Sequence, residues 1–178
     1  MIAFIIGGMK SGKSSFALRE AEKLPHKNFY FIATARATDT EMEERIENHK
    51  KNRDNRWITI EEPIDLSTAL KKIPESSIII IDCLTAWLTN LLMECNPIDE
   101  FLESFLCSLK SYKLKKDAHL FIISNETGTG IIPATELGRT FIDLSGQMNQ
   151  RVMEIADTAY LIIAGQPLKI KRQKESNI

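Results

Sequence analysis

The segment that decides the fold runs from residue 2 to residue 14 and reads IAFII followed by GGMKSGKS. Five consecutive apolar residues are typical of a strand that is buried on both faces of a parallel sheet. The next eight residues match the pattern G-x-x-x-x-G-K-S in full, and residues 14–24 have the character of a helix that Pro25 ends. This order of strand, glycine loop and helix predicts a loop that binds the phosphates of a nucleotide.

Each residue type in the glycine loop has a physical reason to be there. Gly7 and Gly12 can adopt backbone angles that other residues avoid, so successive N–H groups converge on phosphate oxygens at the start of a helix. We expect Lys13 to reach the β- and γ-phosphates and Ser14 to ligate Mg²⁺. The guanine-reading pattern N-K-x-D is absent from the sequence, which leaves the choice between ATP and GTP open.

Further apolar and amphipathic segments alternate along the chain, as expected of a parallel sheet covered by helices. We predict additional strands at residues 29–34, 78–81, 119–124 and 159–164. We predict additional helices at residues 41–51, 84–94 and 98–112. Thr40 and Glu43 have the T-x-x-E spacing of a capping box at the start of the first of these helices, and Pro97 suits the start of the last. The predicted fold class is therefore α/β, with a mostly parallel sheet flanked by helices.

Composition indicates a single globular domain. The 178 residues carry 23 Lys and Arg against 24 Asp and Glu, and 43% are hydrophobic, which excludes disordered, collagen-like and coiled-coil chains. We place one domain at residues 1–171. The polar and charged residues 169–178 are expected to fray, which leaves 172–178 as a C-terminal tail.

Charge and apolar content also limit the partners and the compartment. A net charge of −1 argues against nucleic acid as the main partner, although a local basic patch stays open. No apolar run reaches about 18 residues and no secretory leader is evident, so we expect a cytoplasmic protein without a membrane span. Three cysteines without a C-x-x-C pair suit a reducing compartment, and three scattered histidines give little support to a zinc site.

Asp82 ends the apolar run IIII and is the natural partner for a magnesium ion at the glycine loop. Ligands of open α/β sheets collect at the carboxyl ends of the strands, which is where this carboxylate falls. The alternative is a helix N-cap for the segment that follows, since Asp is a favoured capping residue. The two roles can coexist.

A basic stripe is predicted on the helix over residues 41–51 and just beyond it. Arg45, His49 and Arg53 recur every four residues, and residues 45–56 hold five basic side chains and two acidic ones. This positive surrounding disfavours protonation of the imidazole and attracts a triphosphate. A neutral histidine beside phosphates can act as nucleophile or general base. The alternative is a solvated helix face that carries an incidental histidine.

Seven segments together resemble one family. They are GGMKSGKS at 7–14, FIATA at 31–35, EMEERIENHKKNR at 41–53, WITIEEP at 57–63, IIIIDCLTAWLTNLL at 78–92, ISNETGTGIIP at 123–133 and GRTFIDLSGQMNQRVMEIAD at 138–157. In this order and spacing they resemble the bifunctional adenosylcobinamide kinase / adenosylcobinamide-phosphate guanylyltransferase family of cobalamin biosynthesis, over roughly residues 2–171. The patterns R-I-x-x-H-x-x-x-R, D-C-L-T and N-E-x-G-x-G-I-x-P have no reason to co-occur in a generic P-loop kinase.

This resemblance implies a RecA-like P-loop fold assembled as a homotrimer, and two successive reactions. A nucleoside triphosphate first phosphorylates the terminal hydroxyl of the aminopropanol arm of adenosylcobinamide. GTP then donates GMP to a histidine with release of pyrophosphate, and the phosphorylated corrinoid takes this GMP to give adenosylcobinamide-GDP. The implied substrates are thus a corrinoid and GTP, with ATP left open for the kinase step, and the implied cofactor is Mg²⁺.

The resemblance also implies roles for individual residues. His49 would carry the GMP, Lys13 would act with it in catalysis, and Ser14 and Asp82 would hold Mg²⁺. The implied nucleotide-binding residues are Gly7, Gly8, Met9, Lys10, Ser11, Gly12, Lys13, Ser14, Thr34, Ala35, Arg36, Lys50, Lys51, Asn52, Arg53, Glu61 and Asp82.

Three points of the resemblance stay open. Asn125 and Glu126 begin a family-like glycine loop to which we assign no individual role, and an ordinary turn after a strand is the alternative. Asp54 follows Arg53 where the family often has proline, and Ile142 stands where an arginine is common. Neither departure removes a catalytic group.

Two other functions remain in competition at this point. A single-reaction small-molecule kinase would use the same glycine loop, with the basic stripe binding substrate phosphate. A RecA-like module driven by nucleotide hydrolysis would turn over without any acceptor. The sequence does not identify the residues that hold the corrinoid, because we expect that surface to form between subunits or on loops.

Overall fold

A computed structural model describes residues 1–25, 28–37, 40, 43–44, 47, 54–95, 97–115 and 117–171. Over these residues the chain forms a seven-stranded sheet in the order β3-β2-β4-β5-β1-β6-β7. The strands are β1 (Ile2–Gly7), β2 (Phe29–Ala33), β3 (Trp57–Glu61), β4 (Ile78–Asp82), β5 (His119–Asn125), β6 (Thr158–Ile163) and β7 (Gln166–Lys171). Every pairing is parallel except β6 with β7, which confirms the predicted mostly parallel α/β fold.

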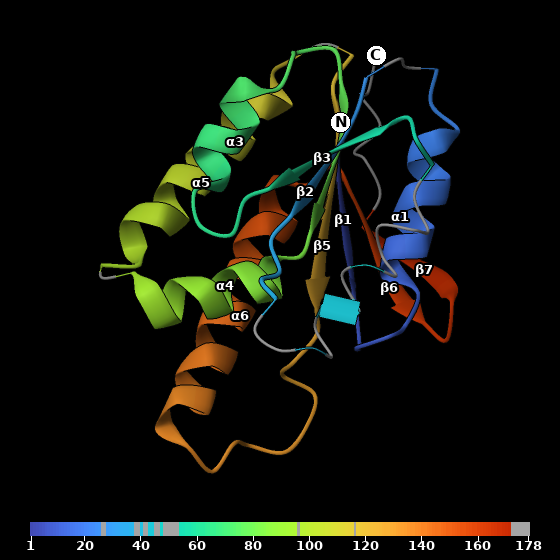
Figure 1. Ribbon diagram of the computed structural model, residues 1–178. Coiled ribbons are helices and arrows are strands. Elements are labelled where there is room, and N and C mark those ends of the chain that lie inside the picture. Colours follow the sequence, from blue (N-terminus) through green and yellow to red (C-terminus); the bar gives the residue numbers. More distant parts are fainter. Residues whose placement is uncertain are drawn as a thin grey trace.

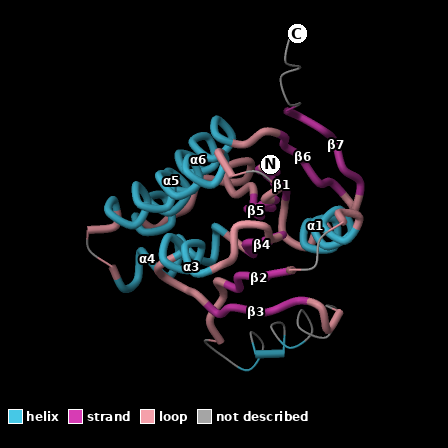
Figure 2. Tube along the Cα trace, turned by 90° about the horizontal axis from the view of Figure 1, so that it is seen from above, coloured by secondary structure: helices cyan, strands magenta, loops and turns pink. Residues whose placement is uncertain are grey.

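Helices lie on both faces of this sheet (Figures 1 and 2). They are α1 (Lys13–Glu22), α3 (Leu66–Lys72), α4 (Leu84–Glu94), α5 (Asp99–Lys113) and α6 (Glu136–Ile155). Among the described helices, α1 covers one face, and α3, α4, α5 and α6 cover the other (Figure 2). Right-handed crossovers between parallel strands produce such a three-layer arrangement.

Alternate residues of the central strands supply the two cores. In β1, Ile2, Phe4 and Ile6 pack in the larger core beneath α4, α5 and α6. Ala3 and Ile5 face the smaller core, which includes residues of α1. Because both faces of β1 are covered, all six of its residues are buried, as the uninterrupted apolar run predicts.

The register brings the carboxyl ends of the central strands to a single edge. Gly7 pairs with Asn125 on β5, and Asp82 pairs with Ala33 on β2. The strand order places β5 between β1 and β4, so the glycine loop, Asp82 and the chain after Asn125 all lie at this edge. This is the part of the sheet where α/β proteins bind ligands.

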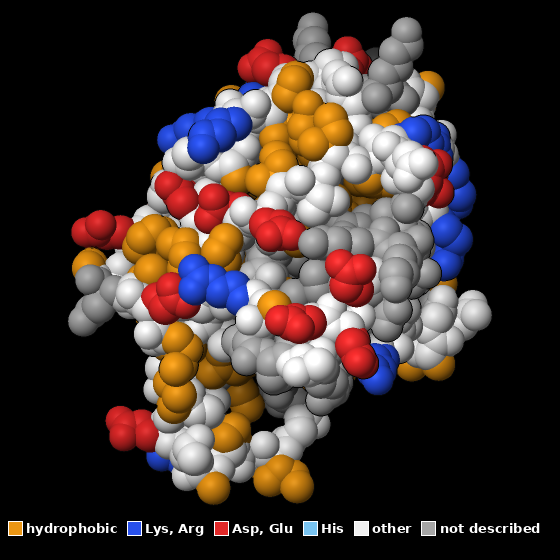
Figure 3. All heavy atoms as spheres, in the orientation of Figure 1, with side chains coloured by type: hydrophobic (Ala, Val, Ile, Leu, Met, Phe, Trp, Pro, Cys, Tyr) orange, Lys and Arg blue, Asp and Glu red, His pale blue; other side chains and the backbone are white. Residues whose placement is uncertain are grey.

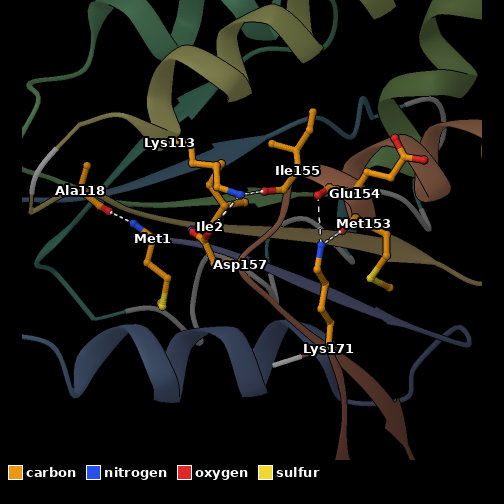
Figure 4. A network of polar contacts seen from close by, with 9 residues as sticks. All are labelled: Met1, Ile2, Lys113, Ala118, Met153, Glu154, Ile155, Asp157 and Lys171. Carbon is orange, nitrogen blue, oxygen red and sulfur yellow. Dashed lines mark hydrogen bonds and ion pairs between the residues drawn. The ribbon is translucent and has the colours of Figure 1, made fainter. Parts of the chain in front are cut away.

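At the other end of the strands, where the central strands begin, two lysines contact the last carbonyl groups of α6 (Figure 4). Lys113 Nζ donates to the carbonyl of Ile155 at 2.6 Å. Lys171 Nζ donates to the carbonyls of Met153 and Glu154. The last carbonyls of a helix lack partners within it and carry partial negative charge, so both lysines stabilise the helix end. Lys171 also attaches β7 to this end.

The structure corrects the prediction for residues 169–178. Residues 169–171 belong to β7 and pair with β6, so they do not fray, while 172–178 lie outside the described residues. Four further elements, β3, β7, α3 and α6, did not appear among the predicted strands and helices. In the part of the chain that is described, no helix is both long and apolar enough to cross a membrane.

Candidate active site

The glycine loop between β1 and α1 is closely packed against the end of β6 and the turn that follows it. A Cβ added to Gly7 would lie 2.4 Å from the carbonyl oxygen of Ile162, and one added to Gly12 would lie 3.2 Å from Gly165 Cα. Gly12 also has φ +99°, a left-handed conformation that side chains rarely adopt. The Ser11 carbonyl accepts from Gly165 N at 2.8 Å. Glycine is therefore required at both positions, as the motif predicts.

Lys13 folds back over this loop as the first residue of α1. Its Nζ donates to the carbonyl of Gly8 at 2.7 Å, and the side chain is buried with 7% of its surface exposed. Burial lowers the pKa of Lys13, while the nearby Cys83 and Asp82 act in the opposite direction. The buried ammonium lacks much of its hydration, so phosphate oxygens at the loop would be strong partners for it.

Ser14 and Asp82 meet beside Lys13. The Ser14 hydroxyl donates to Asp82 Oδ2 at 2.6 Å. The alternative role of Asp82 as an N-cap is wrong, because Cys83 occupies the cap position of α4 without a side-chain hydrogen bond. Asp82 is instead the last residue of β4, with its carboxylate turned towards α1. A hydroxyl and a carboxylate are oxygen donors of the kind that Mg²⁺ prefers.

The Ser11 hydroxyl is a further polar group of the loop that fits phosphate. Its oxygen is buried and has no hydrogen-bond partner among the residues that the structure describes. A buried hydroxyl without a partner costs about 1–3 kcal/mol, so a bound oxyanion would relieve this cost. This observation is independent of the sequence motif and also indicates an anion site.

Thr34, a predicted GTP contact, uses its hydroxyl within the protein. Thr34 Oγ1 donates to the carbonyl of Cys83 at 2.7 Å and accepts from Cys83 N at 2.7 Å. Asn90 Nδ2 donates to the Thr34 carbonyl at 2.8 Å. Thr34 thus joins the ends of β2 and β4 and the helix α4, and it is fully buried. Its side chain therefore links the end of β2 to the start of α4 and is not free to contact GTP.

A hollow of about 590 Å³ opens at the carboxyl ends of β2 and β3. Its lining includes Ala35, Arg36 and Glu61 from the predicted nucleotide-binding residues. It also includes Glu43 and Glu47, which are helical and lie shortly before His49 in the sequence. Acidic side chains are visible in the middle of the face drawn in Figure 3.

Several predicted site residues cannot be located. His49, Lys50, Lys51, Asn52 and Arg53 lie outside the described residues, as does Arg45 of the basic stripe. Thr40 is itself helical, so the prediction that it caps a helix beginning at residue 41 is wrong. The Arg36 guanidinium forms an ion pair with Glu94 of α4, which places it at the rim of the hollow.

The end of β5 and the residue after it are held to the glycine loop, α4 and α6 by contacts that the sequence analysis did not predict. Glu126 N donates to the carbonyl of Gly7 at 3.0 Å. Asn125 N donates to Thr85 Oγ1 at 2.9 Å. The amide of Asn149 on α6 accepts from Ser124 Oγ at 2.7 Å, and this amide is nearly buried. Polar residues at these positions were visible in the sequence, but their contacts depend on the order of the strands.

Fold and site together define a P-loop nucleotide-binding protein of the RecA-like type. Solved structures agree with this class at the level of the fold. A protein from Pyrococcus horikoshii has a TM-score of 0.55 at 9% identity, covering 98% of this chain and 87% of its own. A solved ATPase domain has a TM-score of 0.55 at 12% identity, covering 97% of this chain and 77% of its own.

Sequence comparisons identify the family. Residues 3–170 match the family model described as cobinamide kinase / cobinamide phosphate guanyltransferase. The bifunctional adenosylcobalamin biosynthesis protein CobP of Pseudomonas aeruginosa is 38% identical over 170 residues, which cover 94% of this chain and 95% of that protein. The corresponding CobU of Escherichia coli is 30% identical over 185 residues, covering 96% and 100%.

The chain therefore belongs to the cobinamide kinase / cobinamide phosphate guanyltransferase family. This membership confirms the resemblance found in the sequence. It also identifies the chain as an enzyme of the kinase and guanylyltransferase type.

Proposed function

We propose that this enzyme phosphorylates the aminopropanol hydroxyl of adenosylcobinamide and then transfers GMP from GTP to the product through His49. The family membership supports the pair of activities. Within the structure, the 2.6 Å contact between Ser14 Oγ and Asp82 Oδ2 beside the buried Lys13 carries the proposal. These three groups are what a P-loop needs to hold and polarise a nucleoside triphosphate.

Ser14 and Asp82 are the proposed holders of Mg²⁺. Mg²⁺ in phosphoryl-transfer enzymes takes one or two protein oxygens and completes its shell with phosphate and water. The metal, when bound, would neutralise charge on the phosphates during transfer. Lys13 would contribute by donating to phosphate oxygens from a position that is already buried.

The guanylyl transfer is proposed to proceed in two displacements. In the first, the neutral imidazole of His49 attacks the α-phosphorus of GTP, a P–N bond forms, the proton on the other ring nitrogen passes to solvent, and pyrophosphate leaves with the electron pair of the broken P–O bond. In the second, an oxygen of the corrinoid phosphate attacks the same phosphorus and the P–N bond breaks. The imidazole takes up a proton as it departs. Dividing one difficult transfer into two easier ones is the general advantage of covalent catalysis.

The hollow at β2 and β3 is the proposed site for the nucleoside part of GTP. Glu43, Glu47 and Glu61 give it several carboxylates, which repel phosphate and accept hydrogen bonds from N–H and hydroxyl groups. The proposed phosphate contacts are the basic residues that follow His49, namely Lys50, Lys51 and Arg53, with Asn52 beside them. Ala35 and Arg36 would close the hollow from the end of β2.

Two labelling assays on the same preparations test this division of roles. GTP labelled at the α-phosphate should leave label on the denatured wild-type protein, and GTP or ATP labelled at the γ-phosphate should give labelled adenosylcobinamide phosphate. His49→Ala should lose the first activity and retain the second. His119→Gln is the matched control, because His119 is the first residue of β5 and lies at the end of this strand that is remote from the glycine loop. Equal loss of both activities in His49→Ala would overturn the proposed role.

The assembly and compartment are further proposals. We expect a homotrimer, and light scattering behind a sizing column would measure its mass. Hydrophobic side chains are visible over α4 and the start of α6 (Figure 3), and exposed Ile131, Ile132 and Leu137 offer apolar surface for a subunit contact. Cys83, Cys95 and Cys107 are free thiols, which suits the cytoplasm as a reducing compartment.

A further inference from the structure

A second hollow, of about 690 Å³, lies on the α6 side of the sheet. Its walls are mainly apolar and come from β1, α6, β6 and β7, with Met153, Leu161 and Ile163 among them. Asn149 and Gln150 of α6 add polar groups to the lining. At one end it reaches Gly8 of the glycine loop. It is therefore a mainly apolar pocket that is continuous with the proposed phosphate site.

Glu126 provides an ionisable group where this pocket approaches the glycine loop. Glu126 Oε1 accepts from Gly128 N at 2.8 Å, which orients the carboxylate. The Glu126 backbone is fixed by its 3.0 Å hydrogen bond to the Gly7 carbonyl. The next residue, Thr127, contacts Ser145 of α6 through the two hydroxyls at 3.4 Å. The loop that carries this carboxylate is thus anchored to both walls of the site.

Gly146 keeps the pocket open on the α6 side. It lies in the interior of α6, where glycine costs about 1 kcal/mol relative to alanine. A Cβ added to Gly146 would meet nothing within 4 Å, so neither crowding nor backbone conformation requires glycine there. Its effect is to leave volume in the pocket that a side chain would occupy.

From these observations we infer that the pocket binds the phosphoryl acceptor, with its hydroxyl against Glu126. This inference rests on the proposed kinase function. An acceptor that presents apolar surface, amide groups and a terminal hydroxyl matches the mainly apolar walls with their polar residues, and the end next to Gly8 is where the γ-phosphate would lie. A general base must be within hydrogen-bond reach of the proton that it removes.

The corresponding step is balanced. The acceptor oxygen forms a new P–O bond to the γ-phosphorus, and its proton passes to the Glu126 carboxylate. The bond between the γ-phosphorus and the bridging oxygen breaks, and the nucleoside diphosphate leaves with the electron pair. The Glu126 proton returns to solvent after the product departs.

Filling the pocket tests the binding part of the inference. Gly146→Leu should raise the KM for adenosylcobinamide at least tenfold, with γ-labelled GTP as the donor and its KM unchanged. The matched control is Gln147→Leu, which places the same side chain on the neighbouring exposed position. Equal KM values for the corrinoid in the two variants would overturn the inference. A change of oligomeric mass in Gly146→Leu without a change of this KM would assign the pocket to a subunit contact and would also overturn it.

Replacing the carboxylate tests the catalytic part. Glu126→Gln can keep the contact with Gly128 N, and general-base catalysis contributes about 10²–10⁴-fold, so kcat for phosphorylation should fall by at least about 100-fold. In the wild type this rate should rise with pH along an acid limb, and the limb should be absent in Glu126→Gln. A merely structural role would lower the rate and leave the shape of the pH profile unchanged.

Two results separate the inference from the function on which it rests. If the wild type phosphorylates adenosylcobinamide and the rate of Glu126→Gln is within threefold of the wild-type rate, the inference is overturned and the proposed function stays intact. No phosphorylation of adenosylcobinamide by the folded wild-type protein would overturn both. Nucleotide dissociation constants measured by calorimetry should be equal in the wild type and Glu126→Gln, which checks that the glycine loop is intact.

Discussion

The Ser14 hydroxyl and the Asp82 carboxylate are 2.6 Å apart although 68 positions separate them in the sequence. The order β4-β5-β1 within the sheet makes this contact, since it brings the end of β4 near the start of α1. The contact joins the phosphate-binding loop to the strand that supplies the acidic group. Both groups can ligate a metal ion through oxygen, so the pair can bind a cation together with phosphate.

Separate replacement of the Ser14 hydroxyl and the Asp82 carboxylate should give similar catalytic defects. Ser14→Ala and Asp82→Asn should each lower kcat/KM for corrinoid phosphorylation by about 10²–10³-fold, because each removes a group that stabilises charge during transfer. Each should also raise the MgCl₂ concentration needed for half-maximal rate. Steady-state assays across a MgCl₂ series measure both effects. Unchanged magnesium dependence in both variants would contradict the assignment of the metal ligands.

Lys13→Met should separate activity from stability. Burial lowers the pKa of Lys13, which shows that the folded state disfavours its charge, so removing this charge lifts a desolvation cost. We expect a free energy of unfolding within about 1 kcal/mol of the wild type or above it, with phosphoryl transfer lowered at least about 100-fold. Urea unfolding and enzyme assays measure the two quantities. Lys23→Met, at the exposed C-cap of α1, is the control and should retain activity.

Two glycine substitutions should change stability in opposite directions. Gly12→Ala should cost about 1–3 kcal/mol, because Gly12 has φ +99° and its added Cβ would approach Gly165 Cα to 3.2 Å. Gly146→Ala should stabilise the protein by about 0.5–1 kcal/mol, because it lies in a helix with open space around it. Urea midpoints at equal slope give both values. Destabilisation by Gly146→Ala would contradict the presence of open space around this position of α6.

The end of α6 should depend on Lys171 and not on its neighbour Lys169. Lys171→Met should lower the free energy of unfolding by about 1 kcal/mol, because it removes a cationic donor from the last carbonyls of the helix. Lys169 lies over the Tyr160 ring on exposed β7, so Lys169→Met should cost less than about 0.5 kcal/mol. Equal costs in chemical denaturation would contradict the role given to Lys171.

The elements that were predicted are those whose burial leaves a pattern in the sequence. β1 is buried along its whole length and β4 over Ile78–Ile81, and both read as continuous apolar runs. β3 buries Trp57 alone, and β7 buries none of its six residues, so neither has the run of buried apolar residues that marks β1 and β4. Both are edge strands, which need little apolar surface.

The long helix α6 was missed although Leu144, Met148 and Val152 have helical apolar spacing on the face that packs in the core. Ser145 and Asn149 are buried together with Met148 and Val152. The structure explains the two polar residues, since they bond to Thr127 and Ser124 at the end of β5. Polar residues on a buried face weaken the apolar pattern without removing it.

The candidate site was predictable where one motif holds several groups. Lys13 and Ser14 follow from the glycine loop, and Asp82 follows from its place after a buried strand. The clamp between Thr34 and Cys83 and the approach of Glu126 to Gly7 require knowledge of which strands are neighbours. Spacing alone left the role of His49 open and the family resemblance assigned it, and this role stays a prediction because His49 lies outside the described residues.

The most direct test of the central claim is to locate the GMP on the enzyme. The wild-type protein would be incubated with GTP, digested at neutral or alkaline pH, and analysed by fragmentation mass spectrometry. We predict a single GMP adduct on His49, labile in acid and stable in base as a phosphoramidate is. GMP on another residue, or a folded protein that forms no adduct with GTP, would contradict the account.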